Sequence, residues 1–217
     1  MSQRFRIPEM EGRTARWYAR QRGTESQLRA HREQAERLTE GLPADAAILE
    51  VAPGPGYFAV ELARRGYRVT GLDISRTMVQ IATEYARRAG ATVDFRHGDA
   101  AGLPFDEDSF DLIVCQAAFK NFPRPVAALD EMRRVLRPGG MAVIQDLNSG
   151  ASRADIAEEV RRMGLSPLNA ATTRLTLGWL RRRAHPAAEF RRLAARSTFV
   201  GCEVDTDGLS LEVRLRA

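Results

Sequence analysis

The chain has 217 residues, of which 44% are hydrophobic and 28% charged, which suits one α/β domain that buries roughly 70% of its unfolded-chain surface. Its two cysteines, Cys115 and Cys202, form no CxxC pattern, so neither a disulfide framework nor a zinc cluster is indicated. The formal net charge of +5 arises outside residues 43–148, where 14 acidic residues outnumber 12 basic ones, and this distribution does not favour nucleic-acid binding.

The N-terminal residues lack the uninterrupted apolar stretch of a signal peptide, and no later segment approaches the 18 or so apolar residues of a membrane span. We therefore expect a cytoplasmic protein with no membrane span. Residues 1–42 are predicted to form a helical lead-in. In it, Thr24 and Gln27 resemble a capping box that opens a helix ending near Gly41.

From residue 43 onward, predicted strands and helices alternate. Apolar segments at 46–52, 67–74, 91–100, 110–119 and 141–148 are expected strands, and the segments 57–66, 75–90 and 124–137 between them are expected helices. Ser75 is predicted to cap the second of these helices, Gly90 to close it, and Pro138 to stop the third. This alternation predicts a parallel sheet covered on both faces, with ligands at the carboxyl ends of its strands.

The last third of the chain changes character. Residues 151–197 are predicted to be helical and are rich in arginine, with one helix opened by Ser152 and another around His185-Pro186. Residues 198–204 and 209–217 alternate like strands about Asp207-Gly208, a strong hairpin signal. An antiparallel hairpin is therefore expected to finish the sheet.

The turn "EVAPGPGYF", residues 50–58, indicates a ligand that lies against bare main chain, because a Cβ there would hold the ligand away. Residues 54–59 fit the pattern G-x-G-x-x-G/A, and Asp73 follows Gly54 by 19 residues, a spacing that suits a carboxylate on two ribose hydroxyls. These features indicate an adenosine derivative, so a dinucleotide oxidoreductase is one candidate. Three features argue against this candidate: Glu50, a buried acid that a cationic ligand would justify, Asp99 after the third strand, and the terminal hairpin.

The runs "ILEVAPGPGYFAVELARRGYRVTGLDIS" and "FRHGDAAGLPFDEDSFDLIVCQAAFKNFPRPVAALDEMRRVLRPGGMAVIQDL" resemble the class I S-adenosylmethionine-dependent methyltransferases, in particular the small-molecule, type 11-like branch. The resemblance covers about Ile48 to Leu147. It implies an α/β fold with a Rossmann-like, doubly wound seven-stranded sheet, mostly parallel with an antiparallel C-terminal strand, plus helical cap segments. It also implies a lid at 1–42 and a methyltransferase domain at 43–217, with an acceptor-side insertion or dimer face at 151–197 and the hairpin at 198–217.

The resemblance further implies S-adenosylmethionine as the cofactor and S-adenosylhomocysteine as the product. Glu50 would organise the loop near the methionine amino group, Asp73 would bind the ribose, and Ile74 would pack on the adenine. The full set of implied cofactor-binding residues is Glu50, Ala52, Pro53, Gly54, Gly56, Asp73, Ile74, Asp99, Ala100, Gln116 and Ala117.

On the acceptor side, the candidate substrate-contacting residues are Tyr18, Phe119, Lys120, Asn121 and Asp146. Tyr18 suits either a lid or core packing with Trp17, and Asp146 suits a loop cap better than an acceptor contact. For each of the three histidines, a structural role is likewise favoured over a role as general base: His31 suits a solvated helix face, His97 a place beside the adenine, and His185 a helix cap. No residue is assigned as catalytic and no metal site is indicated.

These features predict an enzyme that transfers a methyl group to a small-molecule acceptor by in-line displacement, chiefly through positioning and desolvation. The methylated atom can be N, O or C. Two alternatives stay open: an RNA methyltransferase, and a homologue that binds the cofactor without transferring its methyl group. For the apolar residues of 151–185, which include Met163, Leu165, Leu168, Leu175, Leu177, Trp179 and Leu180, core packing is the favoured interpretation.

Overall fold

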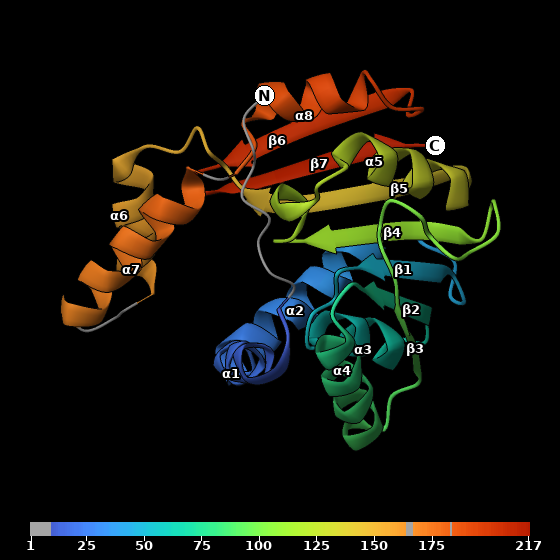
Figure 1. The fold of residues 1–217 in the computed structure, drawn as a ribbon, viewed down its shortest axis with the longest axis horizontal. Coiled ribbons are helices and arrows are strands. Elements are labelled where there is room, and N and C mark those ends of the chain that lie inside the picture. Colours follow the sequence, from blue (N-terminus) through green and yellow to red (C-terminus); the bar gives the residue numbers. More distant parts are fainter. Residues whose placement is uncertain (1–9, 164–166, 183) are drawn as a thin grey trace.

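A computed structural model describes residues 10–163, 167–182 and 184–217. Its strands form one seven-stranded sheet in the order β3-β2-β1-β4-β5-β7-β6 (Figure 1). All neighbouring pairs among β1 to β5 are parallel, whereas β7 is antiparallel to both β5 and β6, as the terminal hairpin predicts. The strands are β1 Ala47–Val51, β2 Arg68–Asp73, β3 Val93–His97, β4 Phe110–Gln116, β5 Leu136–Leu147, β6 Gly201–Asp207 and β7 Ser210–Arg216.

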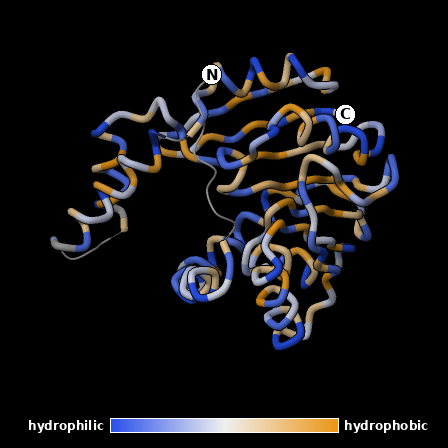
Figure 2. The backbone as a smooth tube through the Cα atoms, in the orientation of Figure 1, coloured by the Kyte–Doolittle hydropathy of each residue, from blue (hydrophilic) through white to orange (hydrophobic). Residues whose placement is uncertain are grey.

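Helices cover both faces of this sheet. They are α1 Gly12–Arg22, α2 Glu25–Thr39, α3 Tyr57–Arg64, α4 Arg76–Ala89, α5 Pro125–Val135, α6 Arg153–Arg162, α7 Pro167–Arg181 and α8 Ala187–Ala194, with a short 3₁₀ turn, η1, at Phe119–Asn121. Apolar residues of α2 and α3 pack on one face of the central strands, and those of α5 and α8 pack on the other. Figure 2 shows hydrophobic residues along the strands and on the helices that cover them.

The cap signals of α4 are confirmed. The Ser75 hydroxyl accepts a hydrogen bond from the Met78 amide, and Gly90 ends the helix in the left-handed conformation. By contrast, Thr24 precedes α2 without a side-chain cap, so its predicted capping box is absent. Helix α5 ends at Val135 rather than at Pro138, because Leu136 already begins β5 and pairs with Phe110 of β4.

Helices α6 and α7 extend away from the body of the domain (Figure 1). The capping box of Ser152 with Asp155 opens α6. The expected core packing of the apolar residues in this segment is wrong for Met163, Leu175 and Trp179, which are exposed by 45%, 76% and 55%. Leu177 packs beside a small separate cluster, whereas Leu165 lies outside the described residues.

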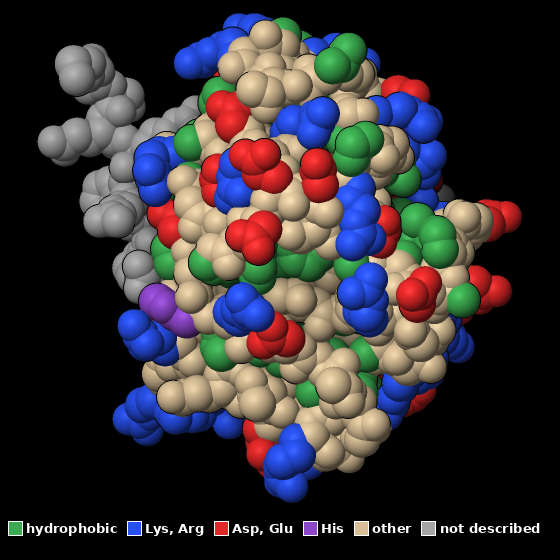
Figure 3. Space-filling view, turned by 90° about the vertical axis from the view of Figure 1, so that its right-hand side faces the viewer, with side chains coloured by type: hydrophobic (Ala, Val, Ile, Leu, Met, Phe, Trp, Pro, Cys, Tyr) green, Lys and Arg blue, Asp and Glu red, His purple; other side chains and the backbone are tan. Residues whose placement is uncertain are grey.

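Charges of both signs are interspersed on the face that Figure 3 presents, which is the end of the sheet away from α6 and α7. That face therefore has no single-sign patch of the kind that binds nucleic acid. No helix in the described part of the chain is long and apolar enough to cross a membrane.

Candidate functional site

The turn between β1 and α3 lies at the carboxyl end of β1, next to the central strand β4, and this edge is the usual ligand edge of such a sheet. Ala52 and Gly54 both have positive φ, 59° and 54°, and both line a cavity of about 270 Å³. A Cβ added to Gly54 would meet no protein atom within 4 Å. The turn therefore presents bare backbone to open space, as the sequence predicts.

Gly56 serves a different purpose. It does not line the cavity, and a Cβ there would lie 2.7 Å from the Phe95 ring and 2.8 Å from the Ala82 Cβ. Its φ of 78° adds to the need for glycine. The second glycine of the turn thus allows α3 and α4 to pack closely, while Gly54 faces the cavity.

Glu50 is a buried acid on the wall of this cavity, exposed by only 2%. Its Oε2 atom has no hydrogen-bond partner among the described residues. Desolvation raises the pKa of this carboxyl to about 8, although the Ala59 amide acts in the opposite direction. A buried carboxylate without a cation is costly, so this position is suited to a positively charged ligand.

The carboxylate of Asp73 lies at the end of β2, next to the turn. Its Oδ2 accepts a hydrogen bond from Gly54 N at 3.0 Å, and its Oδ1 accepts one from Ser75 N at 2.8 Å. Burial raises the pKa of Asp73, and these two amides partly offset that effect. Each carboxylate oxygen can accept more than one hydrogen bond, so Asp73 keeps capacity for a ligand hydroxyl. Ile74 beside it is 40% exposed.

The predicted cofactor-binding residues after β3 lie farther from the turn. Asp99 follows β3, accepts a hydrogen bond from the Ala101 amide and forms an ion pair with Arg124 at 2.9 Å. Ala100 is buried in the core cluster. Neither lines the described cavity, which is therefore the end of the site nearer to β1 and β4, where Gln116 and Ala117 lie.

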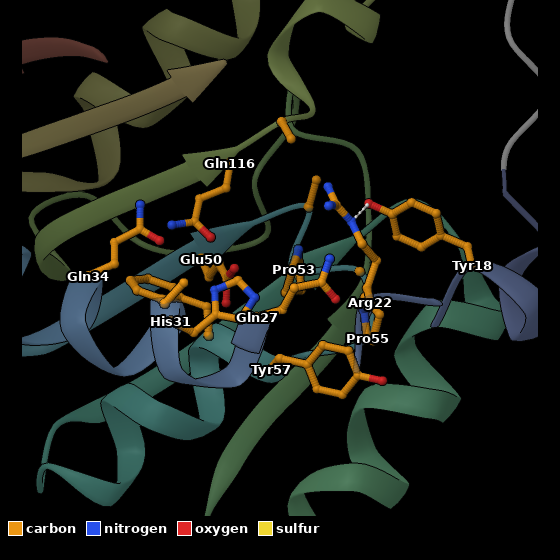
Figure 4. Close-up of a pocket in the computed structure, with 15 residues that line it drawn as sticks. Tyr18, Arg22, Gln27, His31, Gln34, Glu50, Pro53, Pro55, Tyr57 and Gln116 are labelled. Atoms are coloured by element: carbon orange, nitrogen blue, oxygen red, sulfur yellow. Dashed lines mark hydrogen bonds between the residues drawn. The ribbon is translucent and has the colours of Figure 1, made fainter. Parts of the chain in front are cut away.

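Helices α1 and α2 supply the remaining wall of the cavity (Figure 4). Tyr18 is on this wall, as a lid would require, whereas Trp17 is 57% exposed and does not pack in the core. Arg22 donates a hydrogen bond to the Tyr18 hydroxyl at 3.2 Å. The lead-in helices thus cover the turn. The wall from these helices consists of Tyr18, Arg22, Gln27, Ala30, His31 and Gln34.

His31 was expected on a solvated helix face, and the structure instead places it on the cavity wall with its ring centroid 6.1 Å from that of Phe58. Desolvation, with a smaller effect from Arg22, lowers the pKa of His31, so the neutral imidazole is favoured at pH 7. The sequence could have indicated this position only if the face of α2 that turns toward the 52–56 turn had been known. Gln34, one turn further along α2, was missed for the same reason.

The candidate substrate-contacting residues near the end of β4 lie in three different environments. Lys120 forms an ion pair with Asp146, Nζ to Oδ1 at 2.7 Å, and its backbone amide donates to Oδ2 of the same carboxylate. Asp146 therefore holds η1 against β5, which supports the loop-cap interpretation. Phe119 is fully buried against Phe122, so it is a core residue and not part of a substrate wall. Asn121 is exposed and does not line the cavity.

The two other histidines lie outside the cavity wall. His185 is buried, with its ring in edge contact with Phe119 and Phe190. Its expected role as a helix cap is wrong, because Pro186 takes the cap position of α8 and no side chain caps that helix. His97 is exposed at the end of β3, where it pairs in register with Asp73.

The described site thus combines a bare turn, a buried acid whose Oε2 atom has no partner among the described residues, and a polar wall from two N-terminal helices. This arrangement can enclose an extended ligand that carries a cation near Glu50 and hydroxyls near Asp73. It has no nucleophile–base pair of the kind used for covalent catalysis among the residues that line the cavity.

Part of this chain is similar in sequence to known proteins. Residues 49–144 match the family described as "Methyltransferase domain". A demethylmenaquinone methyltransferase of Clavibacter sepedonicus is 40% identical over 103 residues, which are 47% of this chain and 41% of that relative. A ubiquinone biosynthesis O-methyltransferase of Roseobacter denitrificans is 32% identical over 101 residues, which are 46% of this chain and 41% of that relative. The matched part spans about two fifths of the length of these relatives.

The fold has known counterparts over a larger part of the chain. A SAM dependent methyltransferase from Aquifex aeolicus of known structure has a TM-score of 0.70 with this chain, at 16% sequence identity, and the match covers 92% of this chain and 97% of that one. At this identity the likeness concerns the fold.

Proposed function

We propose that this chain is a class I S-adenosylmethionine-dependent methyltransferase, and that it transfers the cofactor's methyl group to a small-molecule acceptor of the quinone type. The observation that carries this proposal is the buried Oε2 of Glu50, which has no hydrogen-bond partner among the described residues and lies on the same cavity as the bare turn. A dinucleotide would bring anionic phosphates to the turn, and these offer no cation that could stabilise an ionised Glu50.

The residues present fit S-adenosylmethionine. Glu50 would face its positively charged methionine end, Ala52 and Gly54 would let the backbone approach, and Asp73 would accept hydrogen bonds from the ribose hydroxyls. Ile74 offers an exposed apolar side chain to the adenine ring. When bound, S-adenosylmethionine supplies a methyl group on a sulfonium sulfur, which a nucleophile displaces in line.

The protein's own contribution is positioning. Orienting two reactants and excluding water can lower a barrier by about 7–11 kcal/mol. Tyr18 and Arg22 would close the cavity from α1, and the turn would hold the other side. His31 faces the same cavity in its neutral form, so it could accept a proton from an acidic O–H of the acceptor.

The acceptor class rests on the relatives. Two of them carry names that refer to demethylmenaquinone and to ubiquinone biosynthesis. A quinol hydroxyl or ring carbon would suit the mechanism above, since both become nucleophilic once an O–H proton is lost.

Calorimetry with S-adenosylhomocysteine and with NAD⁺ tests the cofactor. We expect heat from the first alone, and Asp73→Ala should lower its affinity at least about tenfold, because a charge-assisted contact to the ribose is lost. A radiolabelled methyl group should then appear on a demethylated naphthoquinol. Binding of NAD⁺ without binding of S-adenosylhomocysteine would overturn the proposal.

A further inference from the structure

Helix α7 carries a stripe of apolar side chains on the side that faces away from α6. Ala171, Leu175 and Trp179 follow one another at intervals of four residues, so they share one face of the helix. All three are exposed, Leu175 by 76% and Trp179 by 55%. Leu177, on nearly the opposite side of the helix, packs on the small cluster between α6 and α7. The stripe is therefore the outer face of the arm that these two helices form.

Arginine side chains border this stripe. Arg174 directly precedes Leu175, and Arg182 follows Leu175 by about two helical turns. Both arginines are exposed, and neither forms an ion pair with another described residue. Residues 151–182 contain six arginines against three acidic residues. The arm thus combines exposed apolar side chains with a positive net charge.

The arm extends from the edge of the sheet at which the cavity lies. Strands β4 and β5 are parallel, so both end at that edge, and α6 begins at Arg153 shortly after β5 ends at Leu147. Figure 1 shows α6 and α7 projecting beyond the sheet, away from the body of the domain. A surface bound by the arm would therefore lie beside the ligand edge.

A bilayer of anionic phospholipids matches this combination of groups. In an amphipathic helix at a membrane interface, leucine and tryptophan enter the boundary between head groups and acyl chains, while arginines reach the phosphates. Helix α7 has 15 residues, which is too short to span the hydrocarbon core, so it would lie in the plane of the interface.

A second copy of the chain matches less well. Two arms brought face to face would place like charges together, which opposes association. A stable dimer also buries about 800 Å² on each partner. Met163, Leu175 and Trp179 are each only partly exposed, and even a complete aromatic side chain buries at most about 250 Å², so these three fall short of that area.

We propose that the outer face of α7 binds the surface of an anionic phospholipid bilayer, with Leu175 and Trp179 inserted among the head groups and with Arg174 and Arg182 on the phosphates. Binding to the bilayer does not depend on the proposed function, but its use rests on that function. An apolar acceptor of the quinone type partitions into the same bilayer. The arm therefore holds the ligand edge close to the phase that contains the acceptor.

Co-sedimentation with vesicles tests the surface. One set of vesicles is phosphatidylcholine alone, and the other contains an equal part of phosphatidylglycerol. Wild-type protein should bind the mixed vesicles at least about tenfold more tightly, and the double variant Leu175→Ser, Trp179→Ser should lose about that factor. Arg174→Gln should weaken binding about fivefold, since one arginine near an anionic surface contributes about 1 kcal/mol. Trp17→Ser is the matched control, because Trp17 is 57% exposed but lies on α1, and it should bind like wild type.

Tryptophan fluorescence locates the contact. The chain has two tryptophans, so in Trp17→Phe all tryptophan emission comes from Trp179. Mixed vesicles should shift this emission to shorter wavelength and protect it from quenching by iodide, because the indole ring leaves water. Vesicles of phosphatidylcholine alone should change it little.

Circular dichroism and thermal melts verify that each variant is folded, and Arg174→Gln with the Trp179 emission decides if the double variant is not. The inference is overturned if wild type shows no preference for the mixed vesicles, or if Trp17→Ser loses binding as much as the double variant. Sedimentation velocity without lipid provides a third measurement. A wild-type dimer that the double variant dissociates would assign the stripe to a second copy and overturn the inference.

The vesicle measurements use neither cofactor nor acceptor, so they separate this inference from the proposed function. Vesicle binding through α7 without any methyl transfer would support the surface and reject the proposed function alone. Methyl transfer to a short-chain naphthoquinol without vesicle binding would reject the surface alone.

Discussion

Replacing Glu50 with glutamine should stabilise the free protein and at the same time weaken its ligand binding. The carboxyl is 2% exposed, and its pKa is raised to about 8, compared with 4.5 for a solvated glutamate. Glutamine has nearly the same shape and is neutral at every pH. The variant therefore removes the cost of ionising a buried acid and leaves the packing in place.

The sign and size of the change in stability follow from proton linkage. Between pH 4.5 and pH 8 the folded protein holds a proton on Glu50 that the unfolded chain has released, so the free energy of unfolding falls as the pH rises. The slope is about 1.4 kcal/mol per pH unit, which gives a loss on the order of 4–5 kcal/mol across this window. Below pH 4.5 both states are protonated and the contribution is constant. Glu50→Gln lacks this loss.

Urea unfolding at pH 5 and pH 8 measures the effect. The variant should gain several kcal/mol relative to wild type between these two pH values. Glu61→Gln is the control, because Glu61 is equally buried but lies 3.1 Å from Arg64 and 3.8 Å from Arg65. Its replacement breaks these ion pairs and should lower stability instead.

Ligand binding provides the second half of the test. A cation that binds beside Glu50 favours the carboxylate, so at pH 7 wild type should release close to one proton on binding S-adenosylhomocysteine. Calorimetry in two buffers of different ionisation enthalpy detects that proton. In Glu50→Gln the release should vanish and affinity should fall at least about tenfold. Equal stability of the two proteins at pH 8, with no proton released by wild type, would show that Glu50 already has a cationic partner in the free protein.

Two further pairs of variants test the surroundings of the site. Lys120→Met should lower the free energy of unfolding in urea by about 3–5 kcal/mol, because the Asp146 side chain, only 1% exposed, loses its cation. Adding Asp146→Asn removes the unpaired charge and should restore much of that stability. A double variant as unstable as Lys120→Met would contradict this explanation. Gly56→Ala should destabilise the fold by about 2 kcal/mol or more through its clash with Phe95, whereas Gly54→Ala should chiefly reduce the affinity for S-adenosylhomocysteine. Thermal melts measure the stability of both variants, and calorimetry measures their affinity. A larger loss of stability in Gly54→Ala than in Gly56→Ala would contradict the prediction.

The sequence by itself determined the features that depend on neighbouring residues. The alternation of apolar strands with helices, the Ser75 cap, the Gly90 terminus and the bare turn at 52–56 can all be predicted, because each follows from local backbone preferences and hydrophobic periodicity. Parallel strands place their carboxyl ends at one edge, so Glu50 and Asp73 could also be predicted to lie near each other.

Only the tertiary structure decided which distant side chains meet. Arg37 and Glu212 form an ion pair although 175 residues separate them, and Gln145 reaches Glu212 only because the register of β5 and β7 places them opposite each other. A shift of one residue in that register would turn Glu212 to the other face. The same holds for His31, whose place on the cavity depends on how α2 packs against α3. Local sequence sets neither strand register nor helix packing, because both depend on which arrangement buries the most apolar surface for the whole chain.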